Sequence, residues 1–284
     1  MLTVTVLIEN ATHSEALACE HGLSLLLTCE GKTLLFDTGA SDAFLRNADV
    51  LGADLEAVSA IVLSHGHHDH TGGLYHVLRR FVQKRRGDNP RLPLPEVIAH
   101  PDILLHRRRA ATEKEPGKYL GVPEPALALL QNWPQRLLKT PLYLTEKLLY
   151  LGEIPRKYPE TQALLGEIAR DGVHETDRIL DDSALVYTGG KEKAQALTII
   201  SGCAHAGIIN IVEHAKAVTG VSRIHAVLGG MHMKDVSESV KKRTLRYFVE
   251  QGIEILRGCH CTGNALNEAA QQKPLRTGDY LEVA

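Results

Sequence analysis

The stretch Ser64-His65-Gly66-His67-His68-Asp69-His70-Thr71-Gly72-Gly73 packs four histidines and an aspartate into six consecutive positions. Alternate residues of an extended turn share a face, so His65 and His67 can hold one cation together. Asp69 and His70 then fall beside a second cation, and the glycines let the backbone turn sharply around both. Two cations about 3.5–4 Å apart would hold a bridging hydroxide. We therefore predict a binuclear metal site; the alternative is a solvated histidine-rich loop.

Histidines recur where other predicted strands end in glycine-bearing turns. His205 follows the strand pattern 197–201, and His260 follows the pattern 253–257, which we expect to be the last strand. His232 follows a third such strand in the same way. Strand ends on a shared sheet edge converge in space, so His205 and His260 are natural candidates for the remaining ligands. The other predicted strands lie at 2–8, 23–29, 32–37, 60–64, 96–99, 184–188 and 223–228, and the predicted helices lie at 42–51, 74–83, 101–109, 207–218 and 236–251.

Composition narrows the class of protein. The 284 residues include 15 His and 5 Cys, are 44% hydrophobic and carry a formal charge of −2. This apolar fraction can build a large core, and the balanced charge gives no general attraction to nucleic acid or to an acidic membrane. No apolar run approaches the length of a membrane span, and the start of the chain lacks a basic signal-peptide region. The few, odd-numbered cysteines fit a reducing compartment, so we expect a cytoplasmic protein.

The motif at residues 64–73, together with Phe36-Asp37-Thr38-Gly39, resembles the signature of the metallo-β-lactamase superfamily. Four further stretches are similar to one subfamily, the group around dihydropterin-6-methyl-(ribofuranosyl)aminobenzene 5'-phosphate synthase. These stretches are Glu20–Ser24, Ser201–Ile208, Gly229–His232 and Cys259–Gly263. The resemblance implies an α/β fold, an αββα sandwich with the metals at one edge between the two sheets.

The resemblance also assigns metal ligands position by position. It implies that one metal is bound by His65, His67 and His205, and that the other is bound by Asp69, His70 and His260. Asp37 is implied to lie behind the metal loop and to orient it. Two divalent ions are expected, with Zn first and Fe, Mn or Mg as alternatives, because histidine and carboxylate ligands suit several of these metals.

One feature departs from the superfamily pattern. Many members bridge the two metals with an aspartate located between the third and the last ligand histidine. His232 stands at the matching strand end here, and we expect it either to bind metal or to line the site, with a catalytic role beside Asp69. Asp235 follows three residues later and is expected to cap the helix at 236–251.

Other residues near the motifs have less definite roles. We expect His21 and His68 to face substrate, with turn packing for His21 and a pocket wall for His68 as the structural alternatives. Cys203, Cys259 and Cys261 flank the ligand histidines. Alternation along a strand end turns Cys259 and Cys261 away from His260, so we expect both to be small buried apolar residues.

The middle of the chain contributes no motif. We expect a single domain over residues 1–284, with an insertion of about 100 residues at about 84–182. The segment from Arg79 to Lys118 holds 11 basic and 5 acidic residues, a net charge of +6. This basic segment is either a solvated face or a rim that attracts phosphate-bearing substrates.

Three functions remain open from the sequence. The first is a metal-dependent hydrolase that acts on a small phosphorylated or heterocyclic substrate. A variant of this function is a synthase-type transferase that joins a pterin to an aminobenzene riboside phosphate. The second is a nuclease or phosphodiesterase, which the overall charge and the absence of an aromatic-interleaved basic patch disfavour, so we expect no nucleic-acid partner. The third is a non-catalytic metal and ligand binder. A homodimer is a further expectation.

Overall fold

Two mixed β-sheets pack face to face in the computed structural model, which describes residues 1–111, 116–158, 166–170, 172–190, 195–234, 236–263 and 273–283. The first sheet has the order β17-β1-β2-β3-β4-β5-β8. Its strands are β1 (Leu2–Ile8), β2 (Ser24–Cys29), β3 (Lys32–Phe36), β4 (Val58–Val62), β5 (Glu96–Ala99), β8 (Gln135–Leu137) and β17 (Tyr280–Val283). The second sheet has the order β16-β15-β14-β13-β10-β9. Its strands are β9 (Leu142–Tyr143), β10 (Leu148–Tyr150), β13 (Ala184–Gly189), β14 (Ala196–Ser201), β15 (Ile224–Gly230) and β16 (Ile255–Cys259).

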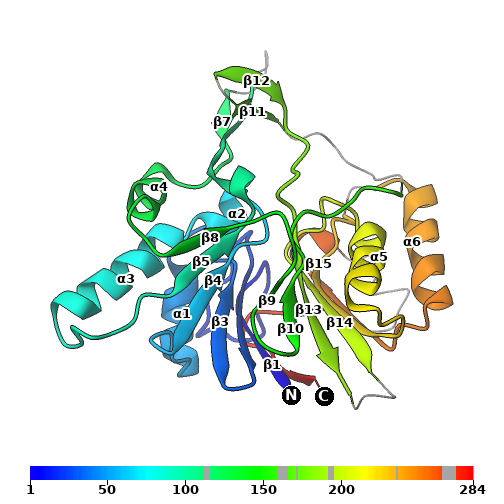
Figure 1. Ribbon diagram of the computed structural model, residues 1–284, viewed down its shortest axis with the longest axis horizontal. Helices are drawn as coiled ribbons and strands as arrows, with labels where there is room; N and C mark the ends of the chain where they lie inside the picture. Colours follow the sequence, from blue (N-terminus) through cyan, green and yellow to red (C-terminus); the bar gives the residue numbers. More distant parts are fainter. Residues whose placement is uncertain are drawn as a thin grey trace.

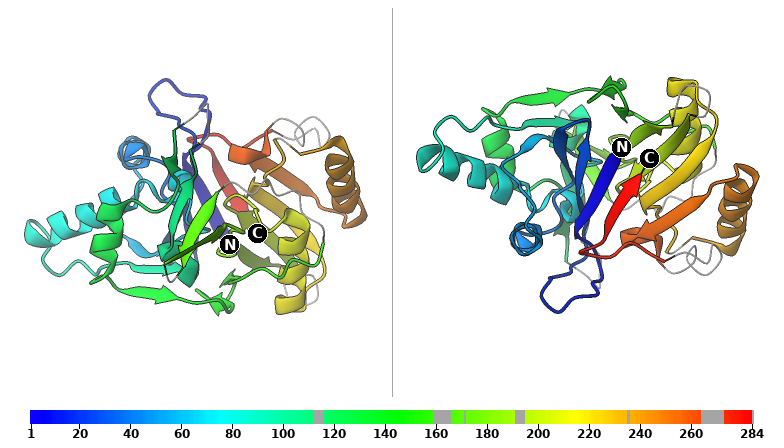
Figure 2. Two further views of the ribbon diagram at one scale, coloured as in Figure 1. Left: turned by 90° about the horizontal axis from the view of Figure 1, so that it is seen from above. Right: turned by 90° about the horizontal axis from the view of Figure 1, so that it is seen from below.

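Helices cover the outer face of each sheet, as Figures 1 and 2 show. One side carries α1 (Ala43–Leu51), α3 (Leu74–Arg86) and α4 (Glu124–Leu130), and the other carries α5 (Ile208–Thr219) and α6 (Glu238–Glu250). Shorter turns are α2 (His68–Thr71), η1 (Pro101–Leu104) and η3 (His260–Thr262). The layers therefore run helix, sheet, sheet, helix, which confirms the predicted αββα sandwich.

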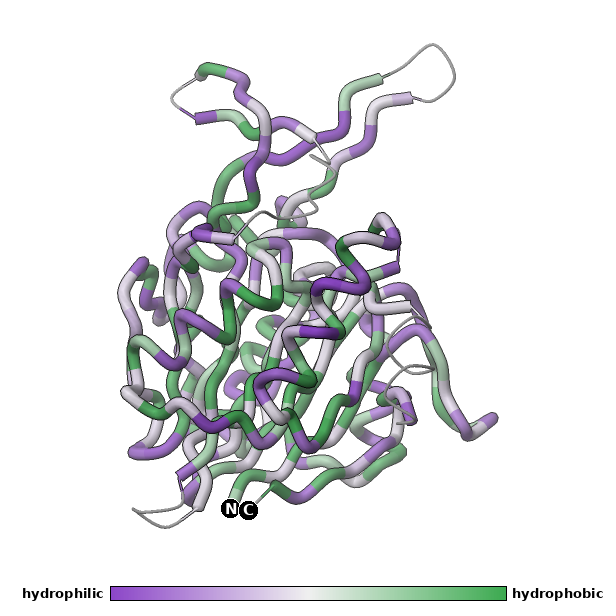
Figure 3. The backbone as a smooth tube through the Cα atoms, turned by 90° about the vertical axis from the view of Figure 1, so that its right-hand side faces the viewer, coloured by the Kyte–Doolittle hydropathy of each residue, from purple (hydrophilic) through white to green (hydrophobic). Residues whose placement is uncertain are grey.

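Period-two burial along the strands explains the layering. Leu34 and Phe36 of β3 belong to the apolar core between the sheets, whereas Leu35 belongs to the core under the outer helices. Neighbouring residues of a strand point to opposite faces, so a strand covered on both sides is apolar throughout. A third core lies between the second sheet and its helices, and Figure 3 shows long hydrophobic stretches running through this body of the molecule.

The parallel strands of both sheets direct their carboxyl ends to one edge of the sandwich. In the first sheet β3, β4 and β5 are parallel neighbours, and in the second sheet β14, β15 and β16 are. The histidine-bearing turns follow β4, β14, β15 and β16, and the Asp37 turn follows β3. The sheet topology thus gathers the predicted site residues, as expected from the strand-end pattern.

The range of about 84–182, expected to be an insertion, contributes strands to both main sheets. Residues in that range supply β5 and β8 to the first sheet and β9 and β10 to the second, because both sheets need these strands to cover their cores. Only a four-stranded sheet of order β12-β11-β6-β7 stands apart and projects from the body (Figure 1). Its strands are β6 (His106–Arg109), β7 (Lys118–Tyr119), β11 (Glu167–Arg170) and β12 (Val173–Thr176).

Two smaller predictions also change. The helix expected at 101–109 is instead one short 3-10 turn followed by the strand β6. This strand pairs with β11 in the small sheet. The strand at 253–257 is not the last, because β17 follows and pairs with β1 beside the chain start. Asp235, the expected helix cap, lies outside the described residues. Within the described ranges, no helix combines the length and the apolar character needed to cross a membrane.

Candidate metal centre

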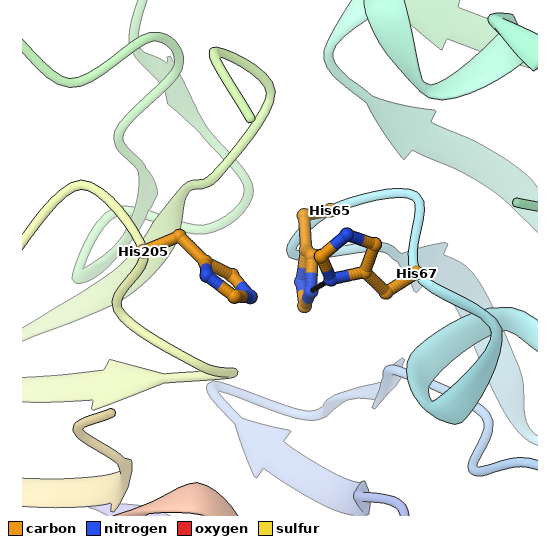
Figure 4. Close-up of side chains that lie close together, drawn as sticks. All are labelled: His65, His67 and His205. Carbon is orange, nitrogen blue, oxygen red and sulfur yellow. Dashed lines mark hydrogen bonds between the residues drawn. The ribbon is translucent and has the colours of Figure 1, made fainter. Parts of the chain in front are cut away.

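Three imidazoles from the two sheets converge at the shared edge. His65 and His67 lie in the loop after β4, and His205 comes from the loop after β14 and faces them (Figure 4). Their candidate ligand atoms lie within 4.8 Å of one another, and all three residues are buried. His65 Nε2 and His67 Nδ1 are 3.0 Å apart. These three residues, called here the first cluster, match the set implied for one metal.

Asp69, His70 and His260 form a second cluster beside the first. His260 Nε2 lies 3.3 Å from Asp69 Oδ2, and His70 Nε2 lies 3.9 Å from the same oxygen. The Nε2 atoms of His70 and His260 are 3.1 Å apart. The rings of His65 and His70 lie 4.3 Å apart between their centroids, so the two clusters are adjacent. The six predicted ligands are thus brought together as two sets of three.

Asp37 supports the loop from behind. Its Oδ1 accepts the main-chain N–H of Ser64 at 2.7 Å, and its Oδ2 accepts the Ser64 hydroxyl at 2.7 Å. The same Oδ2 lies 2.7 Å from His70 Nδ1, which leaves Nε2 facing the cluster. A carboxylate on the far nitrogen of a ligand histidine fixes the ring orientation and makes the ring a stronger donor. Asp37 therefore occupies the orienting position that was predicted for it.

Burial and the neighbouring carboxylates shift the pKa values of the clustered imidazoles. Burial lowers the pKa of His67 to about 4 and holds the pKa values of His65 and His205 well below their usual range. Burial would also lower the pKa of His70, but the carboxylates of Asp37 and Asp69 outweigh it and raise the pKa to about 9. Neutral imidazole is the form that binds metal, so the first cluster is already in its ligating form near neutral pH.

Two acidic residues that the sequence analysis did not single out hold the ligand loops. Asp181 Oδ2 accepts the main-chain N–H of Gly66 at 2.7 Å, and its other oxygen lies 2.7 Å from Arg107 Nη2. Asp182 Oδ2 accepts the main-chain N–H of Ala206 at 2.8 Å, and burial raises the pKa of Asp182 to about 7. Both lie in the region expected to be an insertion. The only sequence feature that pointed to them is the Asp181-Asp182 pair just before the strand β13.

Gly202 allows the two ligand loops to approach closely. A Cβ at this position would lie 2.1 Å from Ser64 Oγ and 2.7 Å from Asp37 Oδ2. These distances are far below van der Waals contact, so the position requires glycine. The strand β14 therefore enters the site directly over the Ser64–Asp37 hydrogen bond.

The remaining predicted site residues surround the clusters at different depths. His232 is half-buried, with its ring centroid 4.4 Å from that of His205. His21 is exposed and stacks on His260 at 4.7 Å, with Nε2 3.4 Å from Asp69 Oδ2. His68 is exposed, and its main-chain N–H bonds Leu120 O at 2.8 Å. His21 and His232 thus adjoin opposite clusters, while His68 faces solvent.

The expectation for Cys261 is wrong, because strand alternation ends before it. His260 has a left-handed backbone, with φ of 52°, and begins the turn η3, so both His260 and Cys261 face the site. Cys261 Sγ lies 3.1 Å from Cys203 Sγ, which in turn lies 3.5 Å from His232 Nδ1. Cys259 is buried in the core between the sheets, as expected.

The donor set fits the metals that the fold family implies. Each cluster offers three nitrogen or oxygen donors, and burial holds the pKa values of the three histidines of the first cluster below their usual range. Zinc in catalytic sites takes three protein ligands of these types and keeps one position open. The carboxylate behind His70 supplies the outer support that such sites use.

Comparisons with known proteins agree with the motifs. A model of the metallo-β-lactamase superfamily matches residues 18–116. The uncharacterized protein MJ0448 of Methanocaldococcus jannaschii is 31% identical over 270 residues, 94% of each chain. The 7,8-dihydropterin-6-methyl-4-(β-D-ribofuranosyl)-aminobenzene-5'-phosphate synthase of that organism is 28% identical over 259 residues, 86% of this chain and 81% of the relative. The crystal structure of Tm1679, described as a metal-dependent hydrolase of the β-lactamase superfamily, matches with a TM-score of 0.79, 26% identity and full coverage of both chains.

Proposed function

The chain belongs to the metallo-β-lactamase superfamily, and on that premise we propose that it is a zinc-dependent hydrolase of small phosphorylated or heterocyclic substrates. The observation that carries the proposal is the pairing of two three-donor clusters at one sheet edge. The rings of His65 and His70, one from each cluster, are 4.3 Å apart. Two divalent ions bound there would supply a Lewis acid and lower the pKa of a water molecule toward neutrality.

The protein's own residues divide the work in this proposal. The first cluster and the second would each hold one ion, and Asp37 keeps His70 turned toward the site. Asp69 is only partly buried, with its side chain 25% exposed, so it lies where substrate and solvent reach the second cluster. A carboxylate at that position can also accept a proton from an attacking water. His232 stands beside His205 and can donate a hydrogen bond to a substrate oxygen.

The small sheet lies beside the metal loop and offers positive charge for a substrate phosphate. Leu120, next to β7, accepts the N–H of His68, so this sheet is joined to the ligand loop by hydrogen bonding. Arg108, Arg109 and Lys118 are exposed on it. The basic segment seen in the sequence is divided, because its first part lies on α3, where Arg80 pairs with Asp49. The part on the small sheet is joined to the ligand loop through Leu120, and on that sheet Arg108 pairs with Glu167.

A synthase is the second candidate, and one observation favours it. The 28% identical relative carries that activity in its name, and the similarity extends over 81% of its length. In such a reaction the same two ions would stabilise a leaving pyrophosphate instead of activating water. The ligand clusters serve either chemistry, so the substrate decides between them.

The test is a substrate screen on zinc-loaded protein. Phosphodiesters, phosphomonoesters and lactones would be assayed for hydrolysis. A pterin pyrophosphate with an aminobenzene riboside phosphate would be assayed for pyrophosphate release. We expect hydrolysis of at least one ester class, abolished by Asp69→Ala. Pyrophosphate release that requires both pterin and amine, with no ester hydrolysis, would establish the synthase instead.

A further inference from the structure

The thiol of Cys203 lies between the two clusters. Its Sγ is within 4.8 Å of donor atoms of both His65, from the first cluster, and His70, from the second. It also groups with His205 and His232, and separately with His260 and Cys261, within the same limit. Outside the six predicted ligands, Cys203 is the only described residue that groups with ligands of both clusters.

We propose that Cys203 is a thiolate ligand shared by the two metal ions, completing the centre that the proposed function requires. This inference rests on that function. A shared thiolate would add to a bridging hydroxide in offsetting the repulsion between two dications held close together. The single aspartate between His205 and His260 in the sequence is Asp235, which lies outside the described residues. The sulfur of Cys203 lies within 4.8 Å of donor atoms of both clusters.

The local backbone brings the thiol to this position. Ala204, between Cys203 and His205, has a left-handed backbone with φ of 59°. The side chains of Cys203 and His205, on either side of this residue, both reach the centre. Cys203 is 3% exposed, which excludes most solvent from the sulfur. A sulfur held beside five imidazoles suits zinc, which combines thiolate with histidine ligands. The thiol proton leaves to solvent as the ions bind.

Cys261 has a positioning part in this arrangement. Its sulfur accepts the main-chain N–H of His232 at 3.2 Å and lies 3.1 Å from Cys203 Sγ. No group of candidate donors within the described residues joins Cys261 to the first cluster. Cys261, which lies in η3, contacts the sulfur of Cys203 and so helps to fix its side-chain rotamer. It is not itself the shared ligand.

X-ray absorption at the zinc edge tests the proposal on unaltered protein carrying two zinc ions. A thiolate shared by both ions gives a sulfur shell at about 2.3 Å with about one sulfur per zinc. A shell of half that amplitude contradicts sharing, because only one ion would then bear sulfur. A shell of nitrogen and oxygen alone overturns the proposal. Either result with two zinc ions bound and hydrolysis intact leaves the proposed function standing.

Cysteine variants identify the sulfur. Cobalt-loaded wild-type protein should show the intense near-ultraviolet thiolate-to-cobalt absorption, and Cys203→Ser should lose it. Cys259→Ala, in the adjoining core, should keep the full band, and Cys261→Ser should keep most of it. A full band in Cys203→Ser overturns the assignment. Because Cys203→Ser can also impair folding, the zinc-edge measurement on unaltered protein is the independent test, and a nitrogen and oxygen shell there contradicts the proposal whatever the variant shows.

Discussion

The Nδ1 atom of His70 lies 2.7 Å from Oδ2 of Asp37, and neither side chain is accessible to solvent. The pair joins the end of β3 to the metal loop after β4, and it leaves the other ring nitrogen of His70 facing Asp69 and His260. Since Asp37 also binds both the hydroxyl and the main-chain N–H of Ser64, one carboxylate fixes the start and the end of the ligand loop.

Asp37→Asn should therefore weaken metal binding without removing a ligand. The amide keeps the size of the side chain but loses the charge that makes His70 a strong donor, so we expect zinc affinity to fall by about 10–100-fold. Competition with a chelator measures this. Asp42→Asn, which alters an exposed carboxylate paired with Arg46, is the control. Equal affinity in Asp37→Asn and wild type would show that the carboxylate does not act on the site.

Much of the centre could be predicted from sequence because it depends on strand ends. Where a parallel strand stops and a histidine follows, topology alone brings the side chain to the shared edge, as for His65, His205 and His260. The buried strands of the sandwich were likewise visible as apolar runs.

Other features could not be predicted because local backbone geometry decides them. Cys261 was placed by strand alternation, but the positive φ of His260 reverses that rule. Asp181 supports Gly66 across 115 positions of sequence, a long-range contact that no local pattern reveals. The strands β8, β9 and β10 are two or three residues long, too short for a periodic pattern to mark them as members of the two main sheets.

Gly202→Ala should disrupt the centre sterically. The new methyl would meet Ser64 Oγ at 2.1 Å and Asp37 Oδ2 at 2.7 Å, and overpacking of this kind costs typically about 1–3 kcal/mol, occasionally more. We expect a lower thermal midpoint and loss of zinc. Gly87→Ala is the matched control, since its Cβ would meet only Gln83 O, at 3.4 Å. A Gly202→Ala protein with unchanged midpoint and zinc content would be inconsistent with the close approach described.

Arg107→Leu should destabilise the protein far more than the same change at its neighbour. Arg107 is 1% exposed and pairs with Asp181 and Asp177, so its loss leaves two buried carboxylates without their positive partner. Removing one partner of a buried pair costs about 3–5 kcal/mol. Arg108→Leu breaks an exposed pair with Glu167, worth at most about 1 kcal/mol. Urea unfolding compares the two, and similar midpoints would refute the structural role of Arg107.

His21→Ala separates substrate binding from metal binding. His21 is 69% exposed and reaches Asp69 only from the mouth of the centre, so we expect zinc content to stay the same. If His21 faces substrate, KM for the substrate found in the screen should rise about tenfold, equivalent to about 1.4 kcal/mol. Loss of one zinc ion in this variant would instead make His21 a ligand.

Elemental analysis of purified protein, with His67→Ala and His68→Ala beside it, tests the central claim most directly. His67 is buried in the first cluster, whereas the adjacent His68 is exposed and outside both clusters. The two variants therefore remove the same imidazole, once from a proposed ligand and once from a neighbour that is not one. We predict two zinc ions per chain in the wild type and in His68→Ala, and at most one in His67→Ala. Two ions retained by folded His67→Ala protein would contradict the account.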